Sequence, residues 1–96
     1  MDSQSPTSAG TVTNLLGLKK FDGMSLTQFD GQMVYNELRD QYGITAVRTT
    51  VSERNSMVTV ALEEADTKAV LALIDKCSHS FQLSYDRNIY LLCIYL

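Results

Sequence analysis

GITAVRTTVSERNSMVTVALEEADTKAVLALIDKC, residues 43–77, carries the clearest structural pattern in the chain. Apolar and polar residues alternate over 44–52 and again over 57–62, which is typical of two half-buried strands. The polar turn Glu53-Arg54-Asn55 between them indicates a hairpin, and Asn55 is able to accept a positive φ.

A helix is predicted directly after the second of these strands. Apolar residues recur there at the spacing i, i+3, i+4 and i+7, at Val70, Leu73, Ile74 and Cys77. Asp66 precedes them and is a good N-cap residue, because its carboxylate can accept a hydrogen bond from an unpaired helical N–H. The segment therefore predicts strand, turn, strand and helix.

The preceding residues predict a strand and a longer helix. Thr11 to Leu18 contains β-branched threonines and several large apolar residues, which favours a first strand. A helical spacing of apolar residues runs from Leu26 to Tyr42, and Ser25 with Gln28 forms a capping-box pattern before it. Alternatively, the helix begins at Gly31 with Asp30 as its cap. Gly43 suits a left-handed C-terminal stop.

The last part of the chain predicts further strands. Ser78-His79-Ser80 ends the second helix, Phe81, Leu83 and Tyr85 alternate with polar residues, and Asp86-Arg87-Asn88 forms a turn. Residues 89–96 are apolar on both faces. A strand of this kind is either central in a sheet or pressed against a partner.

Together these elements predict an α+β fold. With loops kept short, the order is β-α-β-β-α-β, the ferredoxin-like sandwich in which two helices cover one face of an antiparallel sheet, with a possible extra short strand near Phe81. Residues 11–96 form a single domain in this interpretation. Residues 1–10 are rich in Ser and small residues, and we expect them to be a disordered tail.

Composition restricts the classes of function. The 96 residues carry a net charge of −3, and their basic residues are scattered, which argues against nucleic-acid binding. The apolar run at residues 89–96 is far shorter than the roughly 20 residues of a membrane span, and no signal peptide is evident, so we expect a cytoplasmic protein. Cys77 and Cys93 are expected to be buried, reduced thiols.

Residues 43–77 also resemble the ACT-domain family, and within it the regulatory domains of aspartate kinases. The resemblance is carried by Gly43-Ile44, by Ser52-Glu53 leading into Val58-Thr59-Val60, and by the helix 66–73, DTKAVLAL. It implies a non-catalytic regulatory domain that pairs with a copy of itself and binds a small amino acid. The chain carries no kinase domain, and the family normally presents two such domains in tandem.

The family's ligand loop joins the first strand to the first helix, and Gly31 matches its glycine near the helix start. The resemblance thus implies that Phe21, Asp22, Gly23, Met24 and Ser25 lie near the ligand together with Gly31, and that Ser52 and Glu53 lie close to the pocket or to the interface between paired domains. Asp30 completes the predicted set of ligand-binding residues. A loop that enters a helix N-terminus also suits a carboxylate on physical grounds, and Asp22 or Asp30 could hold an ammonium. The alternatives are that Asp30 and Ser25 only cap the helix and that Glu53-Arg54 is a solvated turn.

Tyrosines are concentrated near the end of the chain, and tyrosine is enriched at protein interfaces. The predicted interface residues are Tyr85, Tyr90, Leu92 and Tyr95. An interior strand with tyrosines at its periphery explains the same pattern equally well.

No catalytic motif, nucleophile–base pair or metal-ligand spacing occurs, and the single histidine, His79, is expected in a surface loop. We therefore expect no enzyme, no metal and no cofactor. Two functions follow: a self-associating regulatory module that binds an amino-acid-like ligand, or a protein-interaction or inhibitor domain that uses its sheet edge and tyrosine-rich last strand. An enzyme whose site is assembled without a motif is the third alternative.

Overall fold

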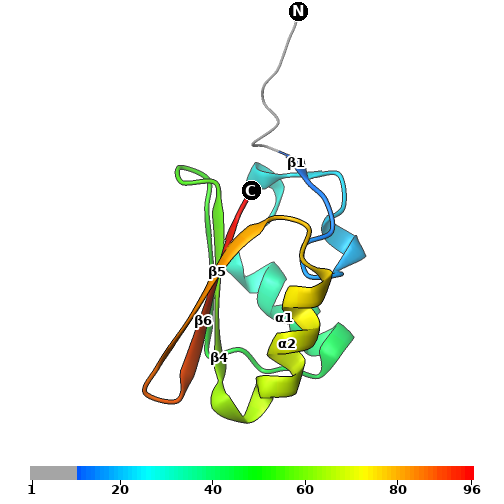
Figure 1. Ribbon diagram of the computed structural model, residues 1–96. Helices are drawn as coiled ribbons and strands as arrows, with labels where there is room; N and C mark the ends of the chain where they lie inside the picture. The colour runs from blue at the N-terminus through cyan, green and yellow to red at the C-terminus, as the bar shows by residue number, and fades with distance from the viewer. Residues whose placement is uncertain (1–10) are drawn as a thin grey trace, which may run out of the picture.

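The computed structural model describes residues 11–96 and shows an α+β domain, as the sequence predicts (Figure 1). Its larger elements are α1 (Gly31–Tyr42), β3 (Arg48–Ser52), β4 (Met57–Glu63), α2 (Thr67–Lys76), β5 (Ser80–Asp86) and β6 (Ile89–Tyr95). Its smaller elements are β1 (Thr11–Val12), β2 (Met24–Ser25) and the 3-10 helices η2 (Lys19–Phe21), η3 (Leu26–Gln28) and η4 (Glu64–Asp66). The predicted tail, residues 1–10, lies outside the described residues.

The main sheet has four strands in the order β3-β4-β6-β5, and every neighbouring pair is antiparallel. Both helices lie on the same side of this sheet, while no element of the described chain covers its other side (Figure 1). β6 is therefore a central strand, which was one of the two interpretations of its apolar sequence.

A ferredoxin-like strand order is not confirmed. That order requires a strand before the first helix within the main sheet, whereas β1 pairs only with β2 in a separate two-stranded sheet. The order of the main elements is α1, β3, β4, α2, β5 and β6. The additional strand near Phe81 is a full member of the sheet.

The predicted first strand over residues 11–18 is wrong beyond Val12. Asn14, Leu16 and Gly17 all have positive φ, which breaks an extended chain. Leu15 and Leu16 are both fully buried, although consecutive residues of a strand point to opposite faces. These leucines instead fill the core as an irregular loop.

Helix α1 begins at Gly31, the alternative start that the sequence suggested. The Asp30 carboxylate accepts a hydrogen bond from the Met33 N–H at 3.1 Å, and Gly43 ends the helix with a φ of 67°. The Ser25–Gln28 capping box is present, but it caps the short helix η3. Asp66 stands at the N-cap of α2 without a capping bond from its side chain.

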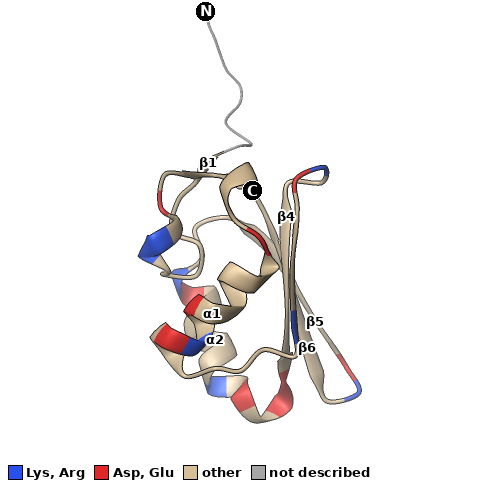
Figure 2. Cartoon of the chain, turned by 180° about the vertical axis from the view of Figure 1, so that it is seen from behind, with Lys and Arg blue, Asp and Glu red and all other residues tan. Residues whose placement is uncertain are grey.

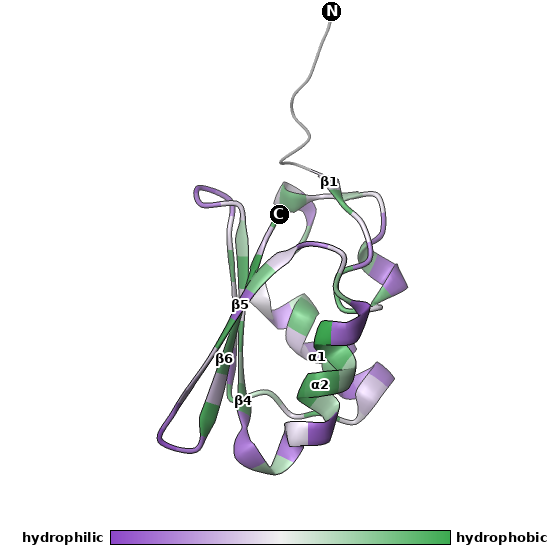
Figure 3. Ribbon diagram, viewed as in Figure 1, coloured by the Kyte–Doolittle hydropathy of each residue, from purple (hydrophilic) through white to green (hydrophobic). Residues whose placement is uncertain are grey.

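The core lies between the helices and one face of the sheet. Alternate residues of the central strands point into it, namely Val58, Val60, Leu62, Leu92 and Ile94, and α2 contributes Val70 and Leu73. Figure 3 shows apolar residues on the helices as well as along the strands. The predicted hairpin forms, and the positive φ of 49° in its turn falls on Ser56, the residue after Asn55.

Candidate functional site

The predicted ligand loop contributes one of its aromatic residues to the core. Phe21 is fully buried, and its ring centroid lies 4.9 Å from that of Phe29. The neighbouring Met24 is half-buried and packs against the same core. Phe21 therefore anchors the loop to the domain.

The polar groups of this loop bond to the loop itself. The Asp22 carboxylate accepts a hydrogen bond from the Asn14 N–H at 2.6 Å, and the Gly23 N–H donates to the carbonyl oxygen of Val12. The Ser25 hydroxyl accepts from the Thr27 N–H at 3.3 Å, and Asp30 caps α1. The contacts of Ser25 and Asp30 agree with the alternative in which these two residues are helix caps, Ser25 of η3 and Asp30 of α1.

Gly31, Ser52 and Glu53 belong to the start of α1, the end of the edge strand β3 and the turn that follows β3. The backbone of Gly31 contacts Thr49 and Thr50 of β3, and Ser52 ends the same strand. The Ser52 hydroxyl accepts from the Asn55 N–H at 3.2 Å, which stabilises the hairpin turn, and Glu53 is exposed in that turn. By the register of β3, Ser52 lies on the open face of the sheet with Arg48 and Thr50, whereas Gly31 contacts the side chain of Thr49 on the helical face.

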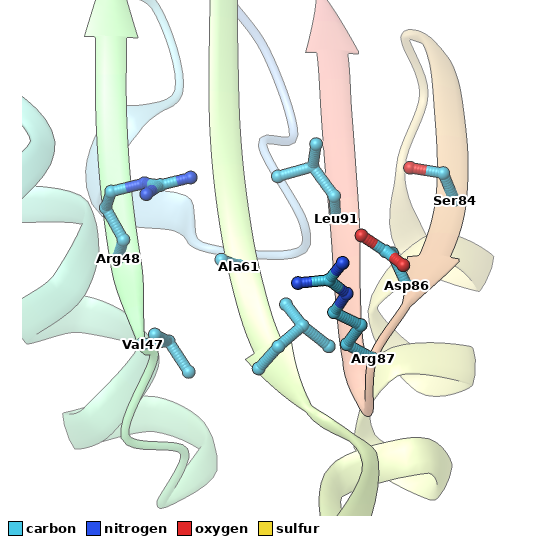
Figure 4. Close-up of a pocket in the computed structure, with 8 residues that line it drawn as sticks. Val47, Arg48, Ala61, Ser84, Asp86, Arg87 and Leu91 are labelled. Carbon is cyan, nitrogen blue, oxygen red and sulfur yellow. The ribbon is translucent and has the colours of Figure 1, made fainter.

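A hollow of about 510 Å³ lies on the opposite side of the molecule, on the open face of the sheet. Its lining comes from all four strands and from the turn that follows β5: Val47, Arg48, Ala61, Ser84, Asp86, Arg87, Ile89 and Leu91. Arg48 and Arg87 extend toward one another from opposite sides of it, above Ala61 and Leu91 (Figure 4). The hollow therefore has an apolar floor with charged groups at its rim.

The two arginines of this hollow, Arg48 and Arg87, form no ion pair with the residues that the structure describes. Among residues 11–96, no Asp or Glu oxygen lies within 4.0 Å of either guanidinium, whereas ion pairs occur at Lys20–Glu37 and Arg39–Asp40. Figure 2 shows most other charged residues on the helical side of the domain and in the turns.

The edge strand β5 is a second exposed feature. The turn Arg87–Asn88 closes its hairpin, so Asp86 and Ile89 form a hydrogen-bonded pair, and such pairs alternate along an antiparallel ladder. The backbone N–H and C=O groups that point away from the sheet are therefore those of Phe81, Leu83 and Tyr85. The side chains of Phe81 and Tyr85 are 40% and 49% exposed.

The other edge of the sheet is shielded. The start of α1 lies against β3, where the Thr49 hydroxyl donates a hydrogen bond to the Gly31 carbonyl oxygen. β5 has no such cover from the part of the chain that the structure describes. The two edges of the sheet are thus not equivalent.

The four predicted interface residues do not form one surface of the domain. Tyr85 is exposed on β5, and Tyr95 is 41% exposed on the open face, where its hydroxyl bonds to Gln82. Leu92 is fully buried in the core, and Tyr90 is half-buried beside it with its hydroxyl 3.2 Å from that of Thr67. A hydrogen bond from the Tyr85 hydroxyl to Glu64 raises the pKa of Tyr85.

The remaining chemically reactive side chains are separate from one another. Cys77 packs against the core, where burial raises the pKa of its thiol, and Cys93 is half-buried on the open face. Residues 11–96 contain no group of three or more His, Cys, Asp or Glu side chains arranged to hold a metal ion. His79 is half-buried in the turn after α2.

Sequence reasoning did not identify Arg48, Ala61 or Arg87 as site residues. The one related signal was that residues 89–96 are apolar on both faces, which is expected either of a central strand or of a strand pressed against a partner. Arg48 and Arg87 come together only through the register of three strand pairs, and a single sequence does not specify that register.

None of the protein-family models, curated proteins or solved structures compared with this chain matches it. The resemblance to ACT domains accordingly stays a hypothesis. Within residues 11–96, neither helix has the length and apolar character needed to cross a bilayer.

Proposed function

We propose that this chain is a non-catalytic protein-interaction module, which accepts an extended segment of a partner protein along β5. The observation that carries the proposal is the exposed edge of that strand. Three residues, Phe81, Leu83 and Tyr85, direct their backbone hydrogen-bonding groups outward in a regular, seven-residue strand.

Edge strands are normally protected, because an unpaired ladder recruits other strands. Lysine, proline and bulges are the usual means of protection, and β5, with the sequence SFQLSYD, contains neither lysine nor proline and pairs without a break along β6. A partner strand would extend the sheet, and its backbone bonds would supply affinity.

The side chains of β5 add selectivity to this backbone pairing. Phe81, Leu83 and Tyr85 project toward the helical side of the sheet, where the rings of Tyr85 and Tyr90 lie 4.9 Å apart. A partner segment with apolar residues at alternate positions would continue this row. We therefore expect the partner to be an extended segment with that alternation.

The amino-acid-binding hypothesis has less support from the contacts of the loop. The carboxylates of Asp22 and Asp30 already accept backbone hydrogen bonds, and the Phe21 side chain is fully buried in the core. A ligand at this loop would have to replace those bonds. The interaction hypothesis requires no such replacement, because the outward groups of β5 have no partner among the described residues.

The test uses a displayed library of random linear peptides as the probe and amide chemical shifts as the readout. We expect selected peptides to alternate apolar and polar residues and to shift the amides of Phe81, Leu83 and Tyr85. Phe81→Pro removes an outward N–H near the strand start, where proline is compatible with an edge strand. It should weaken binding at least about tenfold, since it also removes an aromatic contact.

Ser84→Ala is the matched control, because Ser84 bonds to β6 through its backbone and its side chain lies on the open face. It should leave peptide binding unchanged. The proposal fails if no peptide is selected, or if bound peptides shift other amides and bind Phe81→Pro equally well. Shifts of the loop amides of residues 21–31 on adding any of the 20 amino acids would favour the small-ligand hypothesis instead.

A further inference from the structure

We infer that a second copy of this chain covers the open face of the sheet, forming a face-to-face dimer whose two-fold axis runs along the strands. In this arrangement β3 of each copy lies over β5 of the other, and β4 lies over β6. The inference concerns the face of the sheet and is independent of the proposed binding of a partner segment at its edge.

β6 is apolar on the side of the sheet that no helix covers (Figure 1). Ile89, Leu91 and Cys93 are half-buried there and Tyr95 is exposed, and none of them packs against the core. An antiparallel sheet with one solvated face normally alternates apolar with polar residues. β6 lacks the polar half of that alternation, which indicates that its outer face becomes buried.

The shape of this face also suits a second copy of the chain. Arg48, Ala61, Leu91 and Ser84 form one row across the four strands. Ala61 is only 3% exposed, because its small side chain lies at the floor of the hollow. Leu91 stands beside it on the next strand. The face thus presents a depression next to a larger apolar side chain.

With a two-fold axis along the strands, the larger side chain of each copy faces the depression of the other copy. This symmetry places Leu91 of one copy above Ala61 of its partner and repeats the contact on the other side of the axis. Sheets that pack face to face keep their strands within about 30° of each other, and their side chains interdigitate. Small and large residues on β4 and β6 meet this requirement.

Opposite charges lie at the two edges of this face. Arg48 lies on one edge strand and Asp86 on the other, and the same axis brings each arginine over the partner's β5, beside Asp86 and Ser84. A self-complementary patch of this kind is what a two-fold interface requires. A two-fold axis that ran perpendicular to the strands would instead place each edge strand over the same strand of the partner. Arg48 would then face the partner's β3 and would not pair with Asp86.

The test is the oligomeric state of the full chain, measured by sedimentation equilibrium at concentrations from about 1 μM to about 1 mM. We expect a monomer–dimer equilibrium. Arg48→Asp and Asp86→Arg should each weaken the dimer about tenfold, because either change places like charges opposite each other twice. The double variant R48D/D86R exchanges the two charges and should restore affinity to near that of the natural chain.

Two further variants separate this surface from the edge of the sheet. Leu91→Gln should abolish the dimer with the helices intact by circular dichroism, and Phe81→Pro should leave the dimer unaffected. The inference is overturned by a monomer at every concentration, by a double variant no better than either single one, or by a dimer that only Phe81→Pro disrupts. Peptide binding at β5 can succeed or fail independently of each of these results.

Discussion

The carbonyl oxygen of Gly31 accepts a hydrogen bond from the Thr49 hydroxyl, and this contact holds the first residue of α1 against the edge strand β3. A β-carbon on Gly31 would collide with the Thr49 carbonyl oxygen, which belongs to the backbone of β3 and cannot move aside cheaply. The glycine is therefore required by the close approach of helix and sheet.

Gly31→Ala is consequently expected to destabilise the domain by about 1–3 kcal/mol, the usual range for overpacking. Helix propensity alone predicts the opposite sign, a gain of about 1 kcal/mol. Urea unfolding of the variant decides between the two. Gln32→Ala, at the next and exposed position of the helix, should stay within about 0.5 kcal/mol of the natural chain. A gain in Gly31→Ala, with Gln32→Ala unchanged, would show that helix and strand are farther apart.

A second prediction concerns Tyr42, which connects the end of α1 to the irregular N-terminal loop. Its hydroxyl donates a hydrogen bond to the Leu16 carbonyl oxygen at 2.8 Å. Tyr42→Phe keeps the ring and removes this bond, so the free energy of unfolding should fall by about 1 kcal/mol near neutral pH.

This stability difference should depend on pH in a defined direction. Burial raises the pKa of Tyr42 above its ordinary value of 10.0, so the folded state favours the neutral phenol. The part of the free energy of unfolding that the neutral Tyr42 phenol contributes is complete below pH 10. It is lost as pH rises through the folded-state pKa, because the unfolded chain ionises at lower pH than the folded chain. Urea unfolding of both proteins between neutral and alkaline pH should show the difference narrowing. A constant difference would contradict the assignment.

The local signals in the sequence predicted the helices and hairpins well. Gly43 ends α1 with a left-handed backbone, Asp30 caps its start, and Val70 and Leu73 form the buried face of α2. Each of these features depends on residues within one or two helical turns of each other. Short-range physics is therefore enough to specify them.

The strand order and the open-face hollow depend on contacts that are distant in sequence. Thr11 to Leu18 has the composition of a strand, yet it folds as a loop because Leu15 and Leu16 both reach the core. Ala61 lies in the hollow only because the register of β4 and β6 places it beside Leu91. Tertiary packing overrides composition in the first case, and in the second no local pattern encodes the neighbour.

The loop residues give a third prediction, which separates capping from ligand binding. The Asp22 carboxylate bonds to the Asn14 N–H at 2.6 Å, so Asp22→Ala should lower stability by about 1 kcal/mol in the absence of any ligand. Thermal denaturation with each of the 20 amino acids should give no shift in either protein. Asp75→Ala, exposed on α2, is the control and should stay within about 0.5 kcal/mol. A shift that Asp22→Ala abolishes would restore the loop as a ligand site.

The turn between β5 and β6 supports a fourth prediction. Arg87 and Asn88 have φ values of 52° and 69°, the pair of left-handed conformations found in a two-residue turn of type I′. Asn88 tolerates this backbone and its carbonyl oxygen also accepts from the Glu64 N–H at 2.9 Å, whereas the β-carbon of an arginine makes the same conformation costly.

Arg87→Asn should therefore raise the free energy of unfolding by about 0.5–1 kcal/mol, measured by urea unfolding. Arg54→Asn is the matched control, because Arg54 lies in the β3–β4 turn, where the positive φ belongs to Ser56. It should change stability by no more than about 0.5 kcal/mol. A gain of similar size at both turns would show that losing an arginine, and not relief of the left-handed backbone, is responsible. A loss at Arg87 would mean that its side chain makes a stabilising contact on the open face.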